Sequence, residues 1–206
     1  MISYLLAVET ISVSLAVLLL YLYPLLVLAY AIVRRQLHPS AALIGLFVGA
    51  FTGLYLALSG GEMTLDPGGI TFAAAASCGA AFTFICGARV APAMSPLLMT
   101  FWINAIGLLM ILPLMIGELA LPAAGGGLLA LLLATAFYLV AILSQFEALA
   151  RLPAARAAFL LNLEPVVSIL LARLVLSETL SLIQASGVIL VISMIILSLR
   201  FRPATA

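Results

Sequence analysis

One carboxylate stands inside a long apolar run, and its position makes it the strongest candidate for chemistry in the chain. Glu164 lies directly before Pro165 and two residues after Asn162. Two residues turn a helix by about 200°, so Asn162 and Glu164 are predicted to face different ways. A carboxylate binds a proton or an amine. In lipid an ionisable group costs about 3 kcal/mol or more, so it normally faces a cavity or a partner.

A structural interpretation of the same residues competes with the chemical one. Proline has no N–H to donate, so Pro165 leaves the carbonyl of Leu161 without its usual helical donor. Glu164 could then hydrogen-bond backbone at a kink and hold two helices together. Buried polar groups serve structure more often than chemistry, and both interpretations remain open at this stage.

The proline-bearing run occurs twice in the chain. Residues 19–26 and 160–167 resemble one another, and Pro24 and Pro165 lie about 141 residues apart at the same point of each run. A proline inside a helix of lipid-spanning length bends it, and the neighbouring structure must satisfy the freed carbonyl. Two such helices in corresponding positions indicate a duplicated membrane fold.

Weaker candidates for lining a cavity are polar or aromatic side chains in other apolar segments. They are Tyr21, Tyr23, Phe82, Thr83, Tyr138 and Gln145. Tyr21 and Tyr23 take the places of Asn162 and Glu164 in the first run, so they either line the cavity by symmetry or pack as ordinary aromatics. Serine and threonine in such segments usually bond their own helix.

The composition of the chain indicates whether these apolar segments are surrounded by water or by lipid. The 206 residues are 67% hydrophobic and only 7% charged, whereas a soluble domain carries roughly 25% charged residues. A lipid bilayer is therefore the expected partner, and an all-α, polytopic membrane protein is the expected fold. Taking about 20 residues for one crossing, we expect seven transmembrane helices, at Ser12–Val33, Ala41–Ser59, Ile70–Ala88, Pro96–Ile116, Gly127–Phe146, Ala157–Val175 and Leu182–Leu199.

The arginines predict the orientation, since the chain has no lysine. Seven of the eight fall on one side of the predicted helices: Arg34, Arg35, Arg89, Arg151, Arg156, Arg200 and Arg202. The other side holds Arg173 and four acids, Glu62, Asp66, Glu118 and Glu178. Basic loops stay in the cytoplasm, so the carboxyl terminus is predicted to be cytoplasmic. Asp66 and Pro67 together predict a helix start, and Glu147 and Arg151 predict a local ion pair.

Several other functions find little support in the residues. The chain has no basic patch of the kind that would indicate nucleic acid binding. Cys78 and Cys86 lie about 12 Å apart along one predicted helix, too far for a disulfide, and with His38 they do not make a metal site. No nucleophile and base occur together, and no cofactor motif is present, so we expect neither an enzyme nor a bound cofactor. A lipid-modifying enzyme would need several polar groups gathered at one membrane interface.

Small residues predict close helix contacts. Gly45, Gly49 and Gly53 share one face of the second segment, and a stripe of this kind allows a neighbouring helix to approach closely. Ordinary bundle packing is the simpler interpretation, and a sliding surface between moving repeats is the alternative.

The last third of the chain resembles the second half of an EamA-type member of the drug/metabolite transporter superfamily. The resemblance rests on Leu152-Pro153-Ala154-Ala155, Leu163-Glu164-Pro165-Val166-Val167, Leu176-Ser177-Glu178-Thr179-Leu180, Gln184 and Gly187. The first repeat matches less well, because Leu37-His38-Pro39 replaces the acidic turn around Glu178.

The resemblance implies ten helices in two inverted five-helix repeats, with the seven segments here as helices four to ten. Residues 1–67 would then be the last two helices of the first repeat, and residues 68–206 the second repeat. A full-length relative would then have about 70–75 residues before the position of Met1. A misassigned start codon, a degraded gene or a shortened protein would explain the difference.

The resemblance also implies a function: export of small metabolites, such as amino acids, across the plasma or inner membrane by alternating access without ATP. The alternative is an inactive remnant, or a subunit that needs another chain for its missing helices. A homodimer is a possible assembly.

Overall fold

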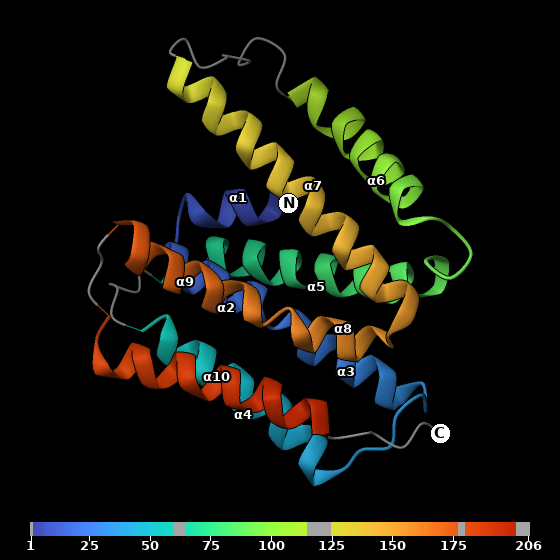
Figure 1. Ribbon diagram of the computed structural model, residues 1–206, viewed down its shortest axis with the longest axis vertical. Coiled ribbons are helices and arrows are strands. Elements are labelled where there is room, and N and C mark those ends of the chain that lie inside the picture. The colour runs from blue at the N-terminus through green and yellow to red at the C-terminus, as the bar shows by residue number, and fades with distance from the viewer. Residues whose placement is uncertain (1, 60–64, 115–124, 177–179, 201–206) are drawn as a thin grey trace. The chain divides into compact units, whose positions relative to one another are not determined.

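The computed structural model describes residues 2–59, 65–114, 125–176 and 180–200. Helices form every regular element of these residues, and none of them is in a strand. The elements are α1 (Ile2–Val8), α2 (Val13–Leu20), α3 (Tyr23–Val33), α4 (Ala41–Ala57), α5 (Pro67–Val90), α6 (Pro96–Ile111), η1 (Leu112–Leu114), α7 (Gly125–Arg151), α8 (Ala154–Leu160), α9 (Leu163–Leu176) and α10 (Leu182–Arg200) (Figure 1). The predicted turn at Glu178 lies outside the described residues, as do Glu62, Glu118 and Arg202.

The expected membrane-spanning segments all correspond to helices, with corrections at their ends. Among the described residues, five are long and apolar enough to cross a membrane: Val13–Val33, Pro67–Val90, Gly126–Arg151, Ala154–Val175 and Leu182–Arg200. The α-helices of the second and fourth segments are short: α4 has 17 residues and α6 has 16, and η1 continues α6 to Leu114. At 1.5 Å per residue each is about 25 Å long, less than the roughly 30 Å of a hydrocarbon core.

Two of the expected continuous helices are broken. The first segment is α2 followed by α3, and the sixth is α8 followed by α9, each with two turn residues between the helices. The sixth also begins at Ala154 rather than Ala157. The short helix α1, before the first segment, is a further difference from the sequence-based expectation.

Side chains cap the starts of α2, α4, α5, α6 and α10, which explains where these helices begin. Asp66 accepts a hydrogen bond from the backbone N–H of Gly69 at 2.7 Å, and α5 begins at Pro67 as predicted. At α10, the Gln184 side chain accepts from the Ser181 N–H at 2.9 Å, while the Ser181 hydroxyl accepts from the Gln184 N–H at 3.2 Å. This reciprocal capping box satisfies two N–H groups that a helix start leaves free.

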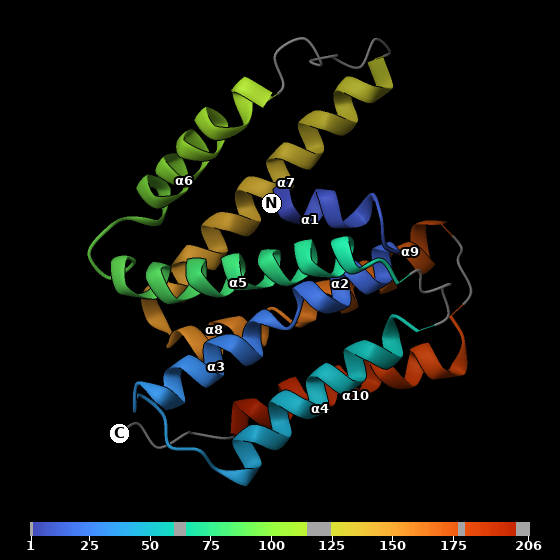
Figure 2. The ribbon, with the colours of Figure 1, turned by 180° about the vertical axis from the view of Figure 1, so that it is seen from behind.

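The helices group into two compact units. The first consists of Met1–Ile85 and Ala154–Ala206, and the second of Cys86–Pro153. In the first unit, α4 packs against α10, α3 packs against α8, and α9 contacts both α4 and α10. Figures 1 and 2 show α4 and α10 side by side from opposite directions. In the second unit, α6 packs against α7.

Glycines bring α4 and α10 into backbone contact. A Cβ added at Gly187 would lie 2.5 Å from the carbonyl oxygen of Gly53 and would overlap the backbone nitrogen of Ala57. A Cβ at Gly49 would lie 2.7 Å from the Met194 sulfur. Gly45 has nothing within 4 Å, so only two glycines of the predicted stripe face α10: Gly49 meets Met194, and Gly53 meets Val191 and Gly187.

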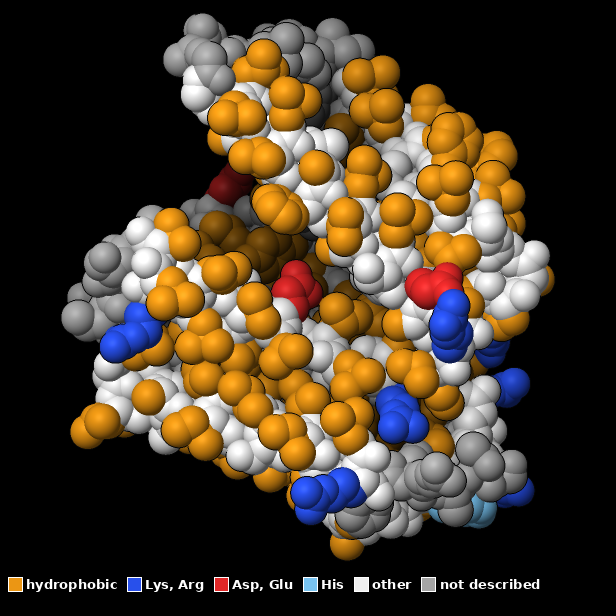
Figure 3. All heavy atoms as spheres, viewed as in Figure 1, with side chains coloured by type: hydrophobic (Ala, Val, Ile, Leu, Met, Phe, Trp, Pro, Cys, Tyr) orange, Lys and Arg blue, Asp and Glu red, His pale blue; other side chains and the backbone are white. Residues whose placement is uncertain are grey.

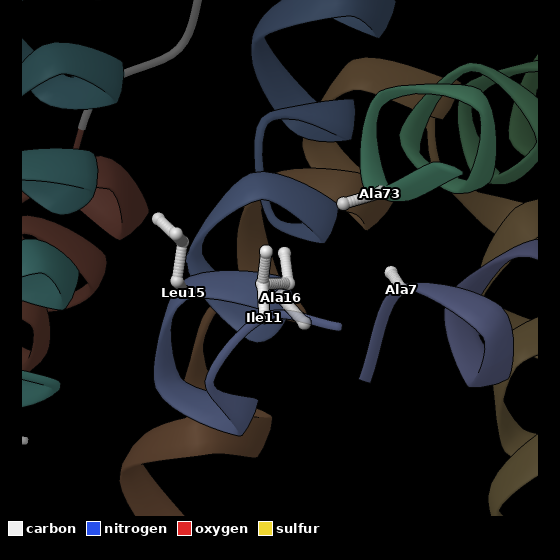
Figure 4. Packing of buried hydrophobic residues seen from close by; sticks show 5 residues of the cluster. All are labelled: Ala7, Ile11, Leu15, Ala16 and Ala73. Atoms are coloured by element: carbon white, nitrogen blue, oxygen red, sulfur yellow. The ribbon is translucent and has the colours of Figure 1, made fainter. Parts of the chain in front are cut away.

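A small apolar cluster joins the beginning of the chain to the beginning of α5. Ala7, Ile11, Leu15, Ala16 and Ala73 are all buried in it, and Figure 4 shows them on α1, on the link that follows it, on α2 and on α5. The short link between α1 and α2 lies against Gly69, where an added Cβ would be 2.7 Å from the Ile11 side chain. The tight fit fixes α1 to α5 within the first unit.

Apolar side chains dominate the surface as well as the interior. Hydrophobic groups cover most of the face shown in Figure 3. In the second unit, Leu109, Met110, Phe137 and Val140 are 63–72% exposed. A soluble protein does not expose so much continuous apolar surface, so lipid is the solvent for these helices.

Candidate functional site

The two helix breaks occur at equivalent places in the two proline-bearing runs. Tyr21 and Leu22 form the first break, and Leu161 and Asn162 form the second. Each proline therefore lies in the first turn of the helix that follows, Pro24 as the second residue of α3 and Pro165 as the third residue of α9. A helix start tolerates proline because its first N–H groups have no helical acceptor. Each expected kink is thus a short break of two turn residues between consecutive helices.

Backbone groups at the second break are satisfied locally. The carbonyl of Leu161, expected to lack its usual donor, accepts from the N–H of Glu164 at 3.0 Å. The Asn162 N–H and its side-chain amide both donate to the carbonyl of Phe159, at 3.1 and 2.9 Å. The side chain of Asn162 is buried, whereas that of Glu164 is exposed. The two face different ways, as their spacing predicts.

The Glu164 carboxylate contacts the other break rather than the backbone at its own. The Tyr21 hydroxyl donates a hydrogen bond to Oε2 of Glu164 at 2.8 Å. Tyr21 is only 7% exposed, so its hydroxyl approaches from the interior of the first unit. This hydrogen bond joins residues 143 positions apart in the chain, one at each break. It brings together two of the residues that the sequence singled out.

Aromatic rings continue inward from this hydrogen bond. The ring of Tyr23 lies 5.8 Å from that of Tyr21 and 5.0 Å from that of Phe84, centroid to centroid. Tyr23 and Phe84 are both buried. These distances are typical of favourable tilted aromatic pairs. The site is therefore a carboxylate on an aromatic wall, and it offers hydrogen-bond acceptance and negative charge.

Phe84, rather than the candidates Phe82 and Thr83, is the α5 residue whose ring lies against Tyr23. Phe82 is 67% exposed, and Thr83 donates to the carbonyl of its own helix at Gly79, 2.9 Å away. Phe84 shares a helix face with Ala73 and Ser77, which are buried in the same unit. The spacing of that small-residue face, at i, i+4 and i+11, is the signal that could have identified Phe84.

The two remaining candidates belong to the second unit. Tyr138 on α7 donates to Oδ1 of Asn104 on α6 at 3.0 Å, and the Asn104 amide donates to the carbonyl of Thr100 at 2.8 Å. Gln145 is half-buried, and its side chain makes no hydrogen bond within the described residues. Tyr138 thus contributes to a link between α6 and α7.

Two buried hydroxyls that the sequence analysis passed over have no hydrogen-bond partner among the described residues. They are Ser77 on α5 and Thr100 on α6. Buried polar atoms usually have a partner, so both mark polar points in apolar surroundings. Within the described part of the chain, no group of three histidine, cysteine or acidic side chains could hold a metal ion.

Helical architecture, apolar surface and broken helices with a polar contact at their breaks define the class: a multi-pass, all-α membrane protein, with helices as the regular elements of the described residues. Residues 67–200 match the model of the EamA-like transporter family. The match covers more than half of the chain, and the chain therefore belongs to this family of drug/metabolite-type membrane transporters.

A solved structure described as "Crystal structure of protein" is similar to the chain in fold. The TM-score is 0.80 at 19% sequence identity, and the likeness covers 94% of this chain and 71% of that one. A comparison with curated proteins gave no match. The structural likeness thus supports the helical arrangement over nearly the whole chain.

Proposed function

We propose that this protein is a secondary transporter that moves small metabolites out of the cytoplasm by alternating access without ATP. Amino acids are the example that the family resemblance implies. We place the protein in the plasma or inner membrane with its carboxyl terminus in the cytoplasm, because seven of its eight arginines fall on one side of the predicted spans. The proposed substrate site is the meeting point of the two helix breaks.

The hydrogen bond between Tyr21 and Glu164 is the observation that carries this proposal. Interrupted backbone at membrane depth is tolerated only where it is buried in protein or lines a cavity. A carboxylate in a membrane segment is costly and typically marks a substrate or ion path. Transporters built from repeats bind their substrates at interrupted helices near the midplane. Both interruptions and the carboxylate meet here.

The proposed repeat boundaries, residues 1–67 and 68–206, agree with this location. Each repeat then contributes one interrupted helix to the site, α2–α3 from the first and α8–α9 from the second. Each also contributes its last helix, α4 or α10, to the glycine contact. We propose that these repeats rock against one another around the site, in the manner of related repeat architectures.

An export assay with a matched pair of variants tests the proposal. Cells that express wild-type protein, Glu164→Gln or Glu147→Gln are loaded with a metabolite mixture, and the medium is analysed by mass spectrometry. Glu147 pairs with Arg151 at the end of α7 and is the control carboxylate. We expect wild type and Glu147→Gln to export the same compounds, and Glu164→Gln to export them at least about tenfold more slowly, because the charge is lost.

Two results would contradict the proposal at different levels. Wild-type rates in Glu164→Gln would remove Glu164 from the site but leave the transporter function intact. Export of no compound by the wild type, from a correctly inserted chain, would reject independent transport. Activity that returns only when a second chain is co-expressed would favour the alternative of a partner subunit, and size-exclusion chromatography in mild detergent would then show a hetero-oligomer.

A further inference from the structure

The charge of Glu164 has no basic partner among the described residues. Its side-chain hydrogen bond comes from a neutral phenol, Tyr21, and no described arginine forms an ion pair with it. Arg173, the basic residue of the same helix, lies nine residues further along α9, about 14 Å at 1.5 Å per residue. Within the described part of the chain, the negative charge of an ionised Glu164 is therefore not balanced by an ion pair.

The described side chains around Glu164 are uncharged and mainly apolar, apart from the hydroxyls of Tyr21 and Ser168. Leu163 and Val167, its neighbours on α9, are 41% and 43% exposed, and the wall behind the carboxylate consists of Tyr21, Tyr23 and Phe84. A small molecule that complements this site has one positive charge and an apolar body. A zwitterion would bring a carboxylate into surroundings that offer it no positive partner, which is unfavourable at low dielectric.

One oxygen of the carboxylate is already occupied in this state. Oε2 accepts from the Tyr21 hydroxyl at 2.8 Å, and Oε1 has no hydrogen-bond partner within the described residues. A phenol supplies a single donor, whereas a primary ammonium supplies three donors and a charge. Hydrogen bonds between two ionised groups are stronger than those from a neutral donor. An ammonium group can therefore displace the Tyr21 hydroxyl from Glu164.

We propose that Tyr21 is a positioning residue which holds Glu164 in the state seen here, and that small apolar amines in their cationic form replace its hydroxyl on the carboxylate. This rests on the proposed function, and among small metabolites it selects amines without a carboxylate in place of the amino acids that the family resemblance offered as an example. Tyr21 then competes with the substrate for Glu164, so it weakens binding and speeds release.

The first experiment measures binding of a defined probe to the purified full chain in lipid nanodiscs. The probe is radiolabelled 2-phenylethylamine, and the competitors are phenylalanine, phenylacetate and phenyltrimethylammonium. We expect the wild type to bind the probe, and none of the three competitors to displace it well. Phenylalanine and phenylacetate carry an unmatched carboxylate, and the quaternary ammonium cannot donate a hydrogen bond.

Variants separate the role of Tyr21 from a purely structural one. Because the competing hydroxyl is removed, we expect Tyr21→Phe to bind the probe about tenfold more tightly, the size of one hydrogen bond. In proteoliposomes the same variant should show a lower KM together with a lower maximal rate. Glu164→Gln should lose binding. Tyr55→Phe is the matched control, since Tyr55 lies on the surface of α4 at 47% exposure.

The outcomes distinguish this inference from the proposed function. If phenylalanine displaced the radiolabelled probe as effectively as unlabelled phenylethylamine does, the proposed substrate class would be wrong. This test needs no variant. Unchanged or weaker binding by Tyr21→Phe would overturn the role of Tyr21. In either case, metabolite export that depends on Glu164 would leave the transporter proposal standing, whereas amine binding without any export would reject the proposed function alone.

Discussion

Two contacts within the first unit join helices that we assign to different repeats, and they are built in opposite ways. The contact of α3 with α8 places the two breaks together, and the hydrogen bond from Tyr21 to Glu164 links them. The contact of α4 with α10 brings two unbroken helices together through Gly53 and Gly187, backbone against backbone.

The difference indicates which contact can change during function. A side-chain hydrogen bond can exchange its partner for a substrate at a cost of about 1 kcal/mol. A backbone contact through glycine has no side chain to rotate away, and close packing of this kind is not continuously deformable. We therefore expect substitutions at α4–α10 to have the larger effect on folding stability, and substitutions at the breaks to have a smaller effect on stability and to change binding and transport.

The largest effect is expected from Gly187→Ala. The added methyl group would meet the Gly53 carbonyl and the Ala57 nitrogen, and backbone atoms cannot give way. Overpacking of this kind costs about 3 kcal/mol. Unfolding of the purified protein in detergent, followed by circular dichroism, measures the loss. Gly45→Ala is the control, because nothing lies within 4 Å and alanine favours the helix by about 0.5 kcal/mol. Equal stability of the two variants would contradict the tight backbone packing that we assign to the contact of α4 with α10.

A smaller loss is expected from Asn162→Ala, which sharpens the account of the second break. The Asn162 amide donates to the Phe159 carbonyl from a buried position. Removing this hydrogen bond should cost about 1.5 kcal/mol in the same unfolding measurement. If Asn162→Ala unfolded like the wild type, the side chain would not stabilise the break, and its role would have to be sought in binding.

A double-mutant cycle isolates the hydrogen bond between the breaks. Tyr21→Phe and Glu164→Leu each remove it. The double variant should therefore lose less free energy of unfolding than the two single variants lose together, in the same unfolding measurement. Interhelical hydrogen bonds in membranes predict a coupling of about 1 kcal/mol. A coupling of zero would mean that the hydrogen bond contributes no stability. The α3–α8 contact could then not be compared with the glycine contact as a source of stability.

The smallest effect is expected from Arg35→Gly, at a position outside both contacts. Arg35 has φ 56°, the left-handed conformation, just after α3 ends. The N–H groups of Arg35 and Gln36 donate to the Ile32 and Ala31 carbonyls, as in a Schellman motif. Glycine adopts this conformation without a steric penalty, so stability should rise by about 0.5 kcal/mol. A loss of stability would show that the Arg35 side chain contributes more than its strained backbone costs.

Local signals in the sequence predicted local structure well. The Asp66-Pro67 pair predicted the start of α5, and the spacing of Glu147 and Arg151 predicted the ion pair that the structure contains. The sequence also contains the signal of the capping box at the start of α10, a serine (Ser181) followed three residues later by a glutamine (Gln184), but the sequence analysis did not identify it. Each of these contacts spans only a few residues, and its geometry therefore follows from the helix alone.

Residues that carried the family resemblance have structural roles that the sequence did not reveal. Gln184 caps α10, Gly187 allows α4 to approach, and Pro165 lies in the first turn of α9. Only Glu164 among them presents an exposed ionisable group in a membrane segment. The motif thus records mainly how the helices begin and pack.

The sequence by itself determined the lipid environment, the positions of the apolar helices and the two equivalent prolines, at which it predicted bends. These follow from composition, from segment length and from the missing N–H of proline. Only the tertiary structure decided that Tyr21 reaches Glu164, that Phe84 rather than Phe82 lies against Tyr23, and that Gly187 rather than Gly45 completes the glycine contact. Such contacts join positions far apart in the chain, and periodicity within one helix identifies a face but not the residue that meets it.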